Sequence, residues 1–129
     1  MGAYDSHFSG EIRITPPLTW AQIRSAPYPA LRDVALGIDE RAEDTPTGQI
    51  RTIVAPGITP IRRSAYNGSD IEAEIQAVID AYPDHEFTGT ITAEPEDPGG
   101  TPWRYVIQGR QVVRQEARLV WPDDSEATT

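Results

Sequence analysis

The segment from residue 69 to residue 83 constrains the fold of this chain more than any other, because its apolar side chains recur at helical spacing. These side chains form one stripe: Ile71, Ile75, Val78, Ile79 and Tyr82. The opposite face carries polar residues: Glu72, Glu74, Gln76 and Asp80. A helix with a single apolar stripe buries that stripe against another layer. The segment therefore predicts an amphipathic helix that covers a sheet and exposes an acidic face.

Residues at both ends of this segment indicate where the helix begins and ends. Ser69 and Glu72 form a capping box, in which the hydroxyl and the carboxylate each accept a hydrogen bond from a backbone N–H. Asp70 favours the positive end of the helix dipole. Pro83 cannot continue the helix and disfavours helical geometry at Tyr82. The helix is therefore expected between Ser69 and Tyr82.

Alternating apolar and polar residues predict six strands around two helices. The predicted strands span residues 8–14, 31–41, 49–55, 86–93, 103–107 and 111–121. Pro16 and Pro17 are expected to end the first strand, and a capping box of Thr19 and Gln22 begins a short helix over residues 20–25. Residues 55–68 are expected to form an irregular connection. On the last strand, the residues expected to face the core are Val113, Ala117, Leu119 and Trp121.

The predicted order of strand, helix, strand, strand, helix and three further strands indicates an α+β fold. Two right-handed strand-helix-strand connections with a hairpin between them give a ferredoxin-like split β-α-β, an antiparallel sheet with both helices on one face. The last two strands add a C-terminal β-hairpin. The chain has 129 residues and no cysteine, and we expect a single domain over residues 1–122 followed by a disordered acidic tail over residues 123–129.

The charge of the chain excludes one class of partner. Eleven basic residues, all arginine, stand against twenty acidic ones, so the net charge is −9. Phosphate binding needs a clustered basic face, and we therefore expect no nucleic acid partner. The sequence has no apolar run of membrane-spanning length and no secretion signal, so we expect no membrane partner and a cytoplasmic location. An acidic surface is complementary to a basic protein, which is the expected partner.

Three stretches of the chain resemble a family of small uncharacterised actinobacterial and actinophage proteins, a domain of unknown function. They are YDSHFSGEIRITPPLTWAQIR, the end of the main helix with AYPDHEFTGTI, and the closing RYVIQGRQVVRQEARLVWP. The resemblance extends over nearly the whole chain to Trp121 and Pro122 and is weakest at residues 57–66. It implies the fold and the source, and it implies no catalytic residues.

Residue types that carry catalysis or bind metals are scarce in this sequence. His85 lies between Asp84 and Glu86, where a solvated loop histidine is favoured over a metal ligand or a general base, and the other histidine, His7, is distant in sequence. The acidic groups at residues 39–44 and 94–97 fall in turn sequence and are expected in solvent. No nucleotide-binding, serine hydrolase or zinc protease motif occurs. We therefore predict no enzyme activity, no cofactor and no metal.

The leading interpretation is a small, acidic, non-catalytic module that binds another protein. A phage-encoded modulator of a host factor and an immunity-type inhibitor of a basic toxin both fit it. The candidate binding residues lie on the main helix and on the terminal hairpin: Asp70, Glu72, Glu74, Asp80, Trp103, Tyr105 and Arg114. Because Glu74 is expected in solvent, its replacement by alanine should hardly change stability. Core packing is favoured for the tryptophans, and one that is exposed on the uncovered sheet face would anchor a protein partner.

Two other functions stay open. The Pro- and Gly-rich loop at residues 57–67 could form the site of a small-ligand-binding protein or of an enzyme. The third interpretation is a homo-oligomeric structural protein. A deep pocket lined by His85 and carboxylates would favour the ligand or enzyme interpretation, and a flat apolar patch would favour protein binding.

Overall fold

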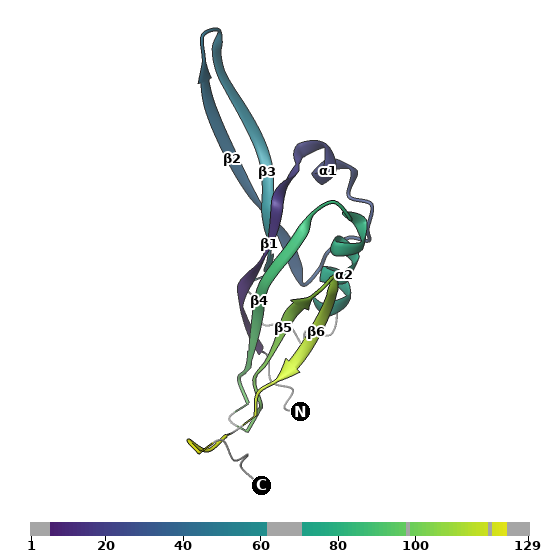
Figure 1. The fold of residues 1–129 in the computed structure, drawn as a ribbon, viewed down its shortest axis with the longest axis vertical. Coiled ribbons are helices and arrows are strands. Elements are labelled where there is room, and N and C mark those ends of the chain that lie inside the picture. The colour runs from purple at the N-terminus through teal and green to yellow at the C-terminus, as the bar shows by residue number, and fades with distance from the viewer. Residues whose placement is uncertain (1–5, 62–70, 98, 119, 124–129) are drawn as a thin grey trace.

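The structure, a computed structural model, describes residues 6–61, 71–97, 99–118 and 120–123 of the chain (Figure 1). Its elements are β1 (Ser6–Thr19), α1 (Trp20–Ser25), β2 (Val34–Thr45), β3 (Gly48–Pro60), α2 (Ile71–Ala81), β4 (Glu86–Pro95), β5 (Trp103–Gln108) and β6 (Gln111–Glu116). Six strands in one sheet and two helices confirm the predicted α+β class. Neither described helix is long and apolar enough to cross a membrane.

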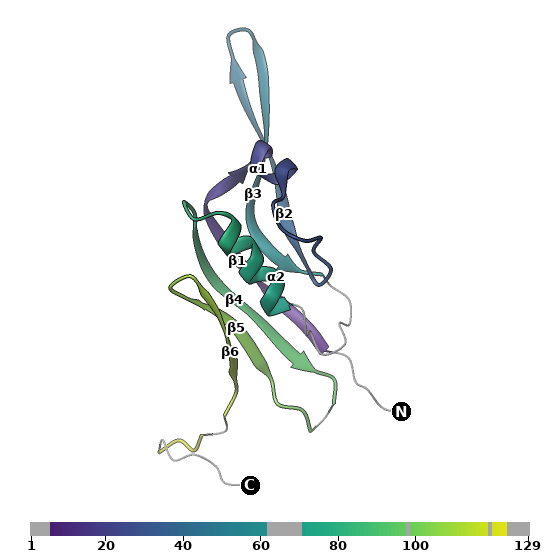
Figure 2. The same cartoon turned by 90° about the vertical axis from the view of Figure 1, so that its right-hand side faces the viewer.

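All neighbouring strands of the sheet run antiparallel, in the order β2-β3-β1-β4-β5-β6. β1 lies inside the sheet because it pairs with β3 along one edge and with β4 along the other. The pairing with β4 is long and regular, from Ser6 opposite Pro95 to Thr15 opposite Glu86. Both helices lie on the same face of the sheet, as Figure 2 shows. No described helix lies over the opposite face.

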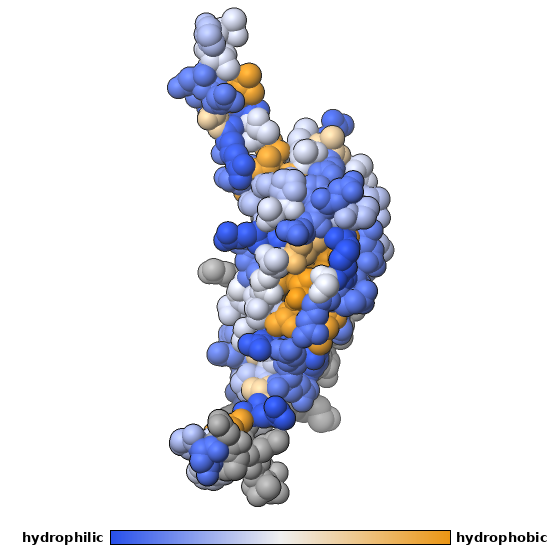
Figure 3. Space-filling view, viewed as in Figure 1, coloured by the Kyte–Doolittle hydropathy of each residue, from blue (hydrophilic) through white to orange (hydrophobic). Residues whose placement is uncertain are grey.

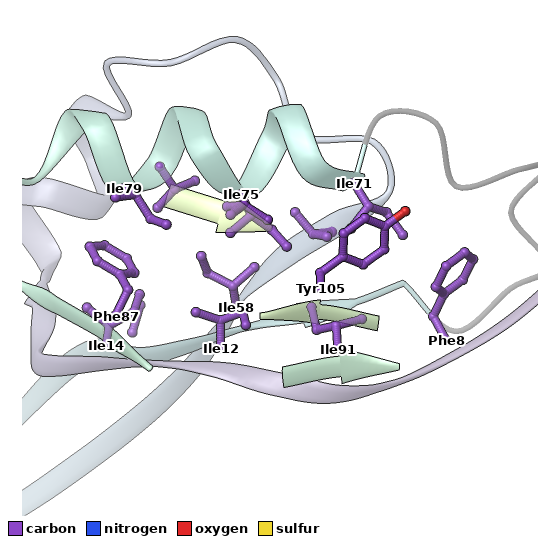
Figure 4. Close-up of a cluster of buried hydrophobic side chains, with 14 of the residues drawn as sticks. Phe8, Ile12, Ile14, Ile58, Ile71, Ile75, Ile79, Phe87, Ile91 and Tyr105 are labelled. Atoms are coloured by element: carbon purple, nitrogen blue, oxygen red, sulfur yellow. The ribbon is translucent and has the colours of Figure 1, made fainter. Parts of the chain in front are cut away.

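The core lies between α2 and the sheet. The buried residues of α2 are those of the predicted stripe: Ile71, Ile75, Val78 and Ile79. Figure 4 shows Ile71, Ile75 and Ile79 above side chains from four strands: Phe8, Ile12, Ile14, Ile58, Phe87, Ile91 and Tyr105. The apolar stripe of α2 is therefore covered by β1, β3, β4 and β5, as a helix of this periodicity requires.

A capping box is predicted at the start of each helix. The first is confirmed, because Gln22 N–H donates to the Thr19 hydroxyl at 3.2 Å and Thr19 N–H donates to Gln22 Oε1 at 2.9 Å. For the second, Ser69 and Asp70 lie outside the described residues. α2 ends at Ala81, close to the end that Pro83 predicts.

The prediction that Pro16 and Pro17 end the first strand was wrong, because β1 continues to Thr19. The pairing of β1 with β4 ends at Thr15, and its pairing with β3 shifts register before resuming at Leu18. The two prolines therefore lie where β1 has left both ladders, and their missing N–H groups cost no ladder hydrogen bond.

The last strand differs from its prediction in length and in phase. β6 ends at Glu116, and its buried residue is Val112, whereas Val113 faces the other side of the sheet. The tight turn at Gly109, with a φ of 61°, sets this register, because it fixes which residues of β5 and β6 stand opposite each other. The remaining predicted core residues lie beyond the strand: Ala117 and Trp121 are exposed, and Leu119 is outside the described residues.

The irregular connection predicted at residues 55–68 is in part a strand. β3 extends to Pro60, so residues 57–60 belong to the sheet and not to a loop. Residues 62–67 are outside the described part of the chain. The ligand loop predicted at residues 57–67 therefore has its first four residues in the sheet. Of the remaining residues, the structure describes Ile61.

The hairpin of β2 and β3 extends beyond the other strands of the sheet (Figure 1, Figure 2). Its outer part, residues 38–53, projects beyond the body of the molecule in both views, and we call it the arm (Figure 1, Figure 2). At the base of the arm the register of β2 and β3 shifts between Gly37 and Asp39. At its tip Pro46 and Thr47 form the turn. Almost every residue of the arm is exposed.

Candidate functional site

Part of the acidic face of α2 holds the fold together. Glu74 is half-buried, and its carboxylate accepts hydrogen bonds from three consecutive backbone N–H groups. The donors are Arg32 at 2.8 Å, Asp33 at 3.0 Å and Val34 at 3.3 Å. Glu74 therefore ties the start of β2 to α2. The expectation that this carboxylate lies free in solvent was wrong, because it accepts hydrogen bonds from backbone N–H groups that are distant in sequence.

Gln76 and Arg110 join α2 to the terminal hairpin. Gln76 Oε1 accepts from Val112 N–H and Gln76 Nε2 donates to the Arg110 carbonyl, both at 2.9 Å, so this amide occupies the place of a further strand at the edge of β6. The Arg110 guanidinium in turn places a positive charge at the C-terminal end of α2, where it complements the helix dipole. Its acceptors are three carbonyls: Ile79, Tyr82 and His85.

The other candidates on α2 are more accessible. Glu72 is exposed, and Asp80 is exposed and accepts a hydrogen bond from Gln76 Nε2 at 3.0 Å. Asp70 lies outside the described residues. Of the four acidic candidates predicted on this helix, the described part of the chain leaves Glu72 and Asp80 available to a partner.

The aromatic candidates of the terminal hairpin lie in the core. Trp103 is 8% exposed and Tyr105 is 1% exposed, and Trp103 Nε1–H donates to the Tyr105 hydroxyl at 3.0 Å. The Arg114 guanidinium lies 4.5 Å from the centre of the Trp103 ring and pairs with Glu116 at 3.3 Å. Neither aromatic side chain is accessible to a partner, so the part of the predicted binding surface that they formed is withdrawn.

His85 is buried, and both of its ring nitrogens have hydrogen-bond partners. Nδ1 lies 2.6 Å from the Pro16 carbonyl oxygen, which can only accept, so Nδ1 carries the proton. Nε2 lies 3.0 Å from Gln22 Nε2 and accepts from it, because Gln22 Oε1 already accepts from Thr19 N–H. His85 is therefore a neutral imidazole without a free lone pair. The predicted solvated loop histidine was wrong, and this one joins β1, α1 and the end of α2.

The surroundings of His85 offer carboxylates but no free imidazole. An open depression of about 490 Å³ adjoins it and is lined in part by Asp84 and Glu86. The second histidine, His7, is exposed and pairs with Glu96 at 2.7 Å. Among the described residues, no group of histidine and carboxylate side chains converges on a possible metal position.

Tyr28 and Tyr82 pack where the connection after α1 meets the end of α2. Their rings are 6.1 Å apart in an edge-to-face arrangement, and the Tyr82 hydroxyl donates to the Gln22 carbonyl at 2.9 Å. Burial, the charge of Tyr82 and a hydrogen bond with it raise the pKa of Tyr28 to about 12. Burial also raises the pKa of Tyr82. Both phenols are therefore neutral at ordinary pH and serve packing rather than proton transfer.

The uncovered face of the sheet is mainly polar. Strand alternation places these side chains on it: Glu11, Arg13, Thr88, Thr90, Thr92 and Arg104. Val106 opposite Val113 is an apolar cross-strand pair on this face, and both residues are half-buried. The exposed tryptophans lie elsewhere, Trp20 at the start of α1 and Trp121 after the end of β6. Among the described residues of its strands, the uncovered face thus carries no aromatic anchor that would indicate a protein interface.

The arm carries exposed apolar side chains on a two-stranded ribbon. Ile38 is 57% exposed and Ile50 is 54% exposed, one near the base of the arm and one near its tip. Apolar surface is visible on the arm in Figure 3, apart from the apolar surface over β4 to β6. No described helix covers either face of this ribbon. The arm therefore exposes isoleucines that a second molecule could bury.

The arm is also charged on both of its faces. Glu40 pairs across the hairpin with Arg51 at 3.1 Å, and Arg41 pairs with Asp39 along the strand at 3.5 Å. Consecutive residues of a strand point to opposite faces, so three charged residues in a row at 39–41 leave neither face fit for a core. This run is the sequence signal that could have identified a projecting hairpin.

Comparison of the chain with known protein families gives a match. The model of a family of unknown function, DUF6205, matches residues 2–129. The chain belongs to DUF6205. Membership confirms the predicted resemblance to a domain of unknown function. Comparisons with curated proteins and with solved structures gave no match.

The geometry of this DUF6205 chain indicates where a partner could bind. It moves the candidate surface away from the positions predicted on α2 and on the terminal hairpin, because Glu74, Trp103 and Tyr105 are occupied in the fold. The arm replaces them as the candidate functional site, with exposed isoleucines and charges on a ribbon that stands clear of the body.

Proposed function

We propose that this DUF6205 protein is a non-catalytic module that binds another protein through its arm. The observation that carries the proposal is the projection of residues 38–53 beyond the sheet, with Ile38 and Ile50 exposed (Figure 1, Figure 3). An isolated two-stranded hairpin is only marginally stable in water. A long hairpin of this kind gains stability when a partner buries its apolar side chains, as exposed apolar groups at interfaces do.

The charge of the arm supports a basic partner. The arm holds four acidic residues and two arginines: Asp39, Glu40, Glu43, Asp44, Arg41 and Arg51. Its excess of negative charge agrees in sign with the net charge of −9 of the whole chain. Such a surface attracts a basic protein over long range and raises the rate of association. A modulator of a host factor and an inhibitor of a basic toxin are two roles that such a module could fill.

The proposal can be tested with a single surface substitution. Ile50→Thr removes the most distal exposed apolar side chain of the arm, and Val120→Thr removes an apolar side chain of 49% exposure outside it as a matched control. Wild type and both variants are immobilised, and captured proteins from lysate of the source organism are quantified. We expect at least one captured protein to be reduced about tenfold by Ile50→Thr and unchanged by Val120→Thr, as for an interface anchor.

Two outcomes would contradict the proposal. The first is the same quantities of captured proteins for Ile50→Thr and wild type, at a far-UV circular dichroism spectrum that shows both folded. The second is an equal loss for Ile50→Thr and Val120→Thr, which would mean nonspecific adhesion of exposed apolar groups.

We propose further that β1 to β4 with the two helices form the ferredoxin-like split β-α-β expected from the sequence. The strand order supports it, since β1 lies between β3 and β4 while β2 lies outside β3. The hairpin of β5 and β6 then extends the sheet beyond β4. An experimental structure that places a different strand beside β1 would contradict this assignment.

A further inference from the structure

The two outer edges of the sheet are treated differently. At β6, the Gln76 amide satisfies Val112 N–H and the Arg110 carbonyl, so a side chain from α2 occupies the edge. At β2, on the side away from β3, no described strand pairs, and the described side chain that hydrogen-bonds to this edge is Glu74, which accepts from Val34 N–H at the start of the strand and leaves residues 35–45 open. An unpaired edge is a template for a further strand, which natural proteins normally cover or interrupt.

The β2 edge is also long and regular. β2 has twelve residues and contains no proline. Its register with β3 shifts between Gly37 and Asp39, where β3 passes from Gly57 to Val54, so the additional residue of this bulge belongs to β3. The side chains of β2 therefore alternate without interruption along the whole edge. A strand of this length and regularity is suited to pair with another strand.

We propose that β2 pairs antiparallel with β2 of a second copy of this chain, with the two-fold axis at Glu40. A two-fold axis perpendicular to a continuous sheet keeps each side chain on its own face. Only residues of the same face can then stand opposite each other, so the axis must pass through a residue position. With the axis at Glu40, Asp39 stands opposite the partner's Arg41, and Arg41 opposite the partner's Asp39.

Charge complementarity selects this register. Opposite charges directly across two strands stabilise the pairing and like charges oppose it. The axis at Glu40 brings together two pairs of opposite charge. An axis at Arg41 would instead place the two Arg41 residues together and Asp39 opposite the partner's Glu43. An axis at Ala42 gives two favourable pairs, between Arg41 and the partner's Glu43, but also two repulsive pairs, between Glu40 and the partner's Asp44.

The second face of β2 is compatible with the same register. Ile38, which is 57% exposed in the single chain, comes to lie opposite the partner's Ala42. The two Glu40 residues meet at the axis, but each is paired with an arginine of its own hairpin, since Arg51 Nη1 lies 3.1 Å from Glu40 Oε1. The repulsion at the axis is therefore reduced. Charged residues on an edge usually prevent pairing, and here their order along the strand makes one symmetric pairing favourable.

This inference goes beyond the proposed function, because a dimer through β2 leaves the β3 strand of each arm, with Ile50, available to a different partner. The dimer would present two such arms. Its interface is one pair of strands, so a weak association is expected, with dissociation in the range of about 10 µM to 1 mM.

The test uses two charge substitutions. Each alone should weaken the dimer, and a mixture of the two variants should restore it. Asp39→Arg gives a chain with arginine at both positions 39 and 41, and Arg41→Asp gives a chain with aspartate at both. In the proposed register each variant opposes itself with like charges, whereas one chain of each kind restores both favourable pairs. Sedimentation velocity is measured over about 10 µM to 1 mM protein for wild type, for each variant and for their equimolar mixture.

We expect a concentration-dependent dimer for wild type, about tenfold weaker association for each single variant, and recovery in the mixture. Glu43→Arg is the matched control, because it changes the charge of β2 by the same amount while the residue opposite is the partner's Gly37. Wild type that stays monomeric at the highest concentration would overturn the proposal. A mixture as weak as its components, or a Glu43→Arg protein that no longer dimerises, would overturn the register. None of these results affects capture through Ile50.

Discussion

The carboxylate of Glu74 holds the backbone N–H of Asp33 with both of its oxygens, at 3.0 Å to Oε1 and 3.3 Å to Oε2, although the two residues are 41 positions apart. The same carboxylate accepts from the neighbours of Asp33 on either side. Three successive backbone donors at the start of β2, from Arg32 to Val34, therefore have an acceptor that another element supplies. A side chain on the polar side of an amphipathic helix is thereby part of the fold rather than of the surface.

This contact predicts that Glu74→Ala lowers the free energy of unfolding by about 1.5 to 3 kcal/mol, the usual contribution of hydrogen bonds to a charged group. Glu74→Gln keeps one acceptor oxygen and should lose less. Urea titration followed by far-UV circular dichroism measures both. Asp80→Ala, on the same helix and exposed with a hydrogen bond to Gln76, is the control and should change stability by less than about 0.5 kcal/mol. Equal midpoints for Glu74→Ala and Asp80→Ala would contradict the structural role of Glu74.

The core could be predicted from the sequence because its signal is local. The spacing of Ile71, Ile75, Val78 and Ile79 reports that one side of a helix is buried, whatever it packs against. The capping box of Thr19 and Gln22 is likewise contained within four residues. Such features depend on neighbours in the sequence, and the structure reproduces them.

The contacts that remove predicted residues from the binding surface join elements that are distant in sequence, so residue spacing could not predict them. Glu74 and Gln76 look like solvated helix residues in the sequence, yet their partners come from the start of β2 and the edge of β6. The phase of β6 depends on the turn conformation at Gly109 rather than on its own alternation. The arm differs again, because the alternation that predicts its strands at residues 31–41 and 49–55 does not reveal that Ile38 and Ile50 are exposed beyond the body.

Arg110 should contribute to stability as the residue that caps α2. Arg110→Ala removes the donors from three carbonyls and the positive charge from the end of the helix dipole, so we expect a loss of about 1 to 3 kcal/mol in the free energy of unfolding. Arg104→Ala is the matched control, because Arg104 is exposed and bonds only to Gln115 among the described contacts. A chemical denaturation midpoint that is as low for Arg104→Ala as for Arg110→Ala would contradict this assignment.

Two isoleucines in opposite environments test the division between body and arm. Ile75 is fully buried, so Ile75→Ala should lower the free energy of unfolding by about 2 to 4 kcal/mol through lost burial and a cavity. Ile50 is 54% exposed on the arm, so Ile50→Ala should cost less than about 1 kcal/mol. Thermal and urea unfolding of the two variants give the comparison. A similar loss of unfolding free energy in both variants would mean that the Ile50 side chain is packed against the rest of the protein and would contradict an exposed arm.

The charge distribution predicts that the protein does not bind nucleic acid at physiological salt. A chain of net charge −9 is repelled by phosphate, and its arginines are dispersed or engaged, as Arg110 is at the end of α2. Fluorescence anisotropy of labelled single- and double-stranded DNA and RNA should therefore stay constant up to micromolar protein. An increase in anisotropy that weakens as salt is added would contradict the prediction.

Tyr28 predicts how stability changes at alkaline pH. Burial and its neighbour Tyr82 raise the pKa of Tyr28 to about 12 in the folded protein, from 10.0 in an unperturbed tyrosine. Below pH 10.0 both states hold this proton and the stabilisation is fully present. Between pH 10.0 and about 12 the unfolded chain releases the proton while the folded chain retains it, so the free energy of unfolding falls. Partial exposure of Tyr28 makes this loss smaller than the full shift would give.

The measurement that isolates this effect is urea unfolding of wild type and Tyr28→Phe at intervals from about pH 8 to pH 12. Phenylalanine cannot ionise, so the variant should lose less stability over the interval than wild type, even if it is less stable at the lowest pH through loss of the hydrogen bond with Tyr82. The quantity to compare is therefore the slope against pH and not the midpoint at one pH. Parallel slopes for the two proteins above pH 10.0 would show that Tyr28 does not titrate with a raised pKa, and the packing of its ring against Tyr82 at the end of α2 would have to be revised.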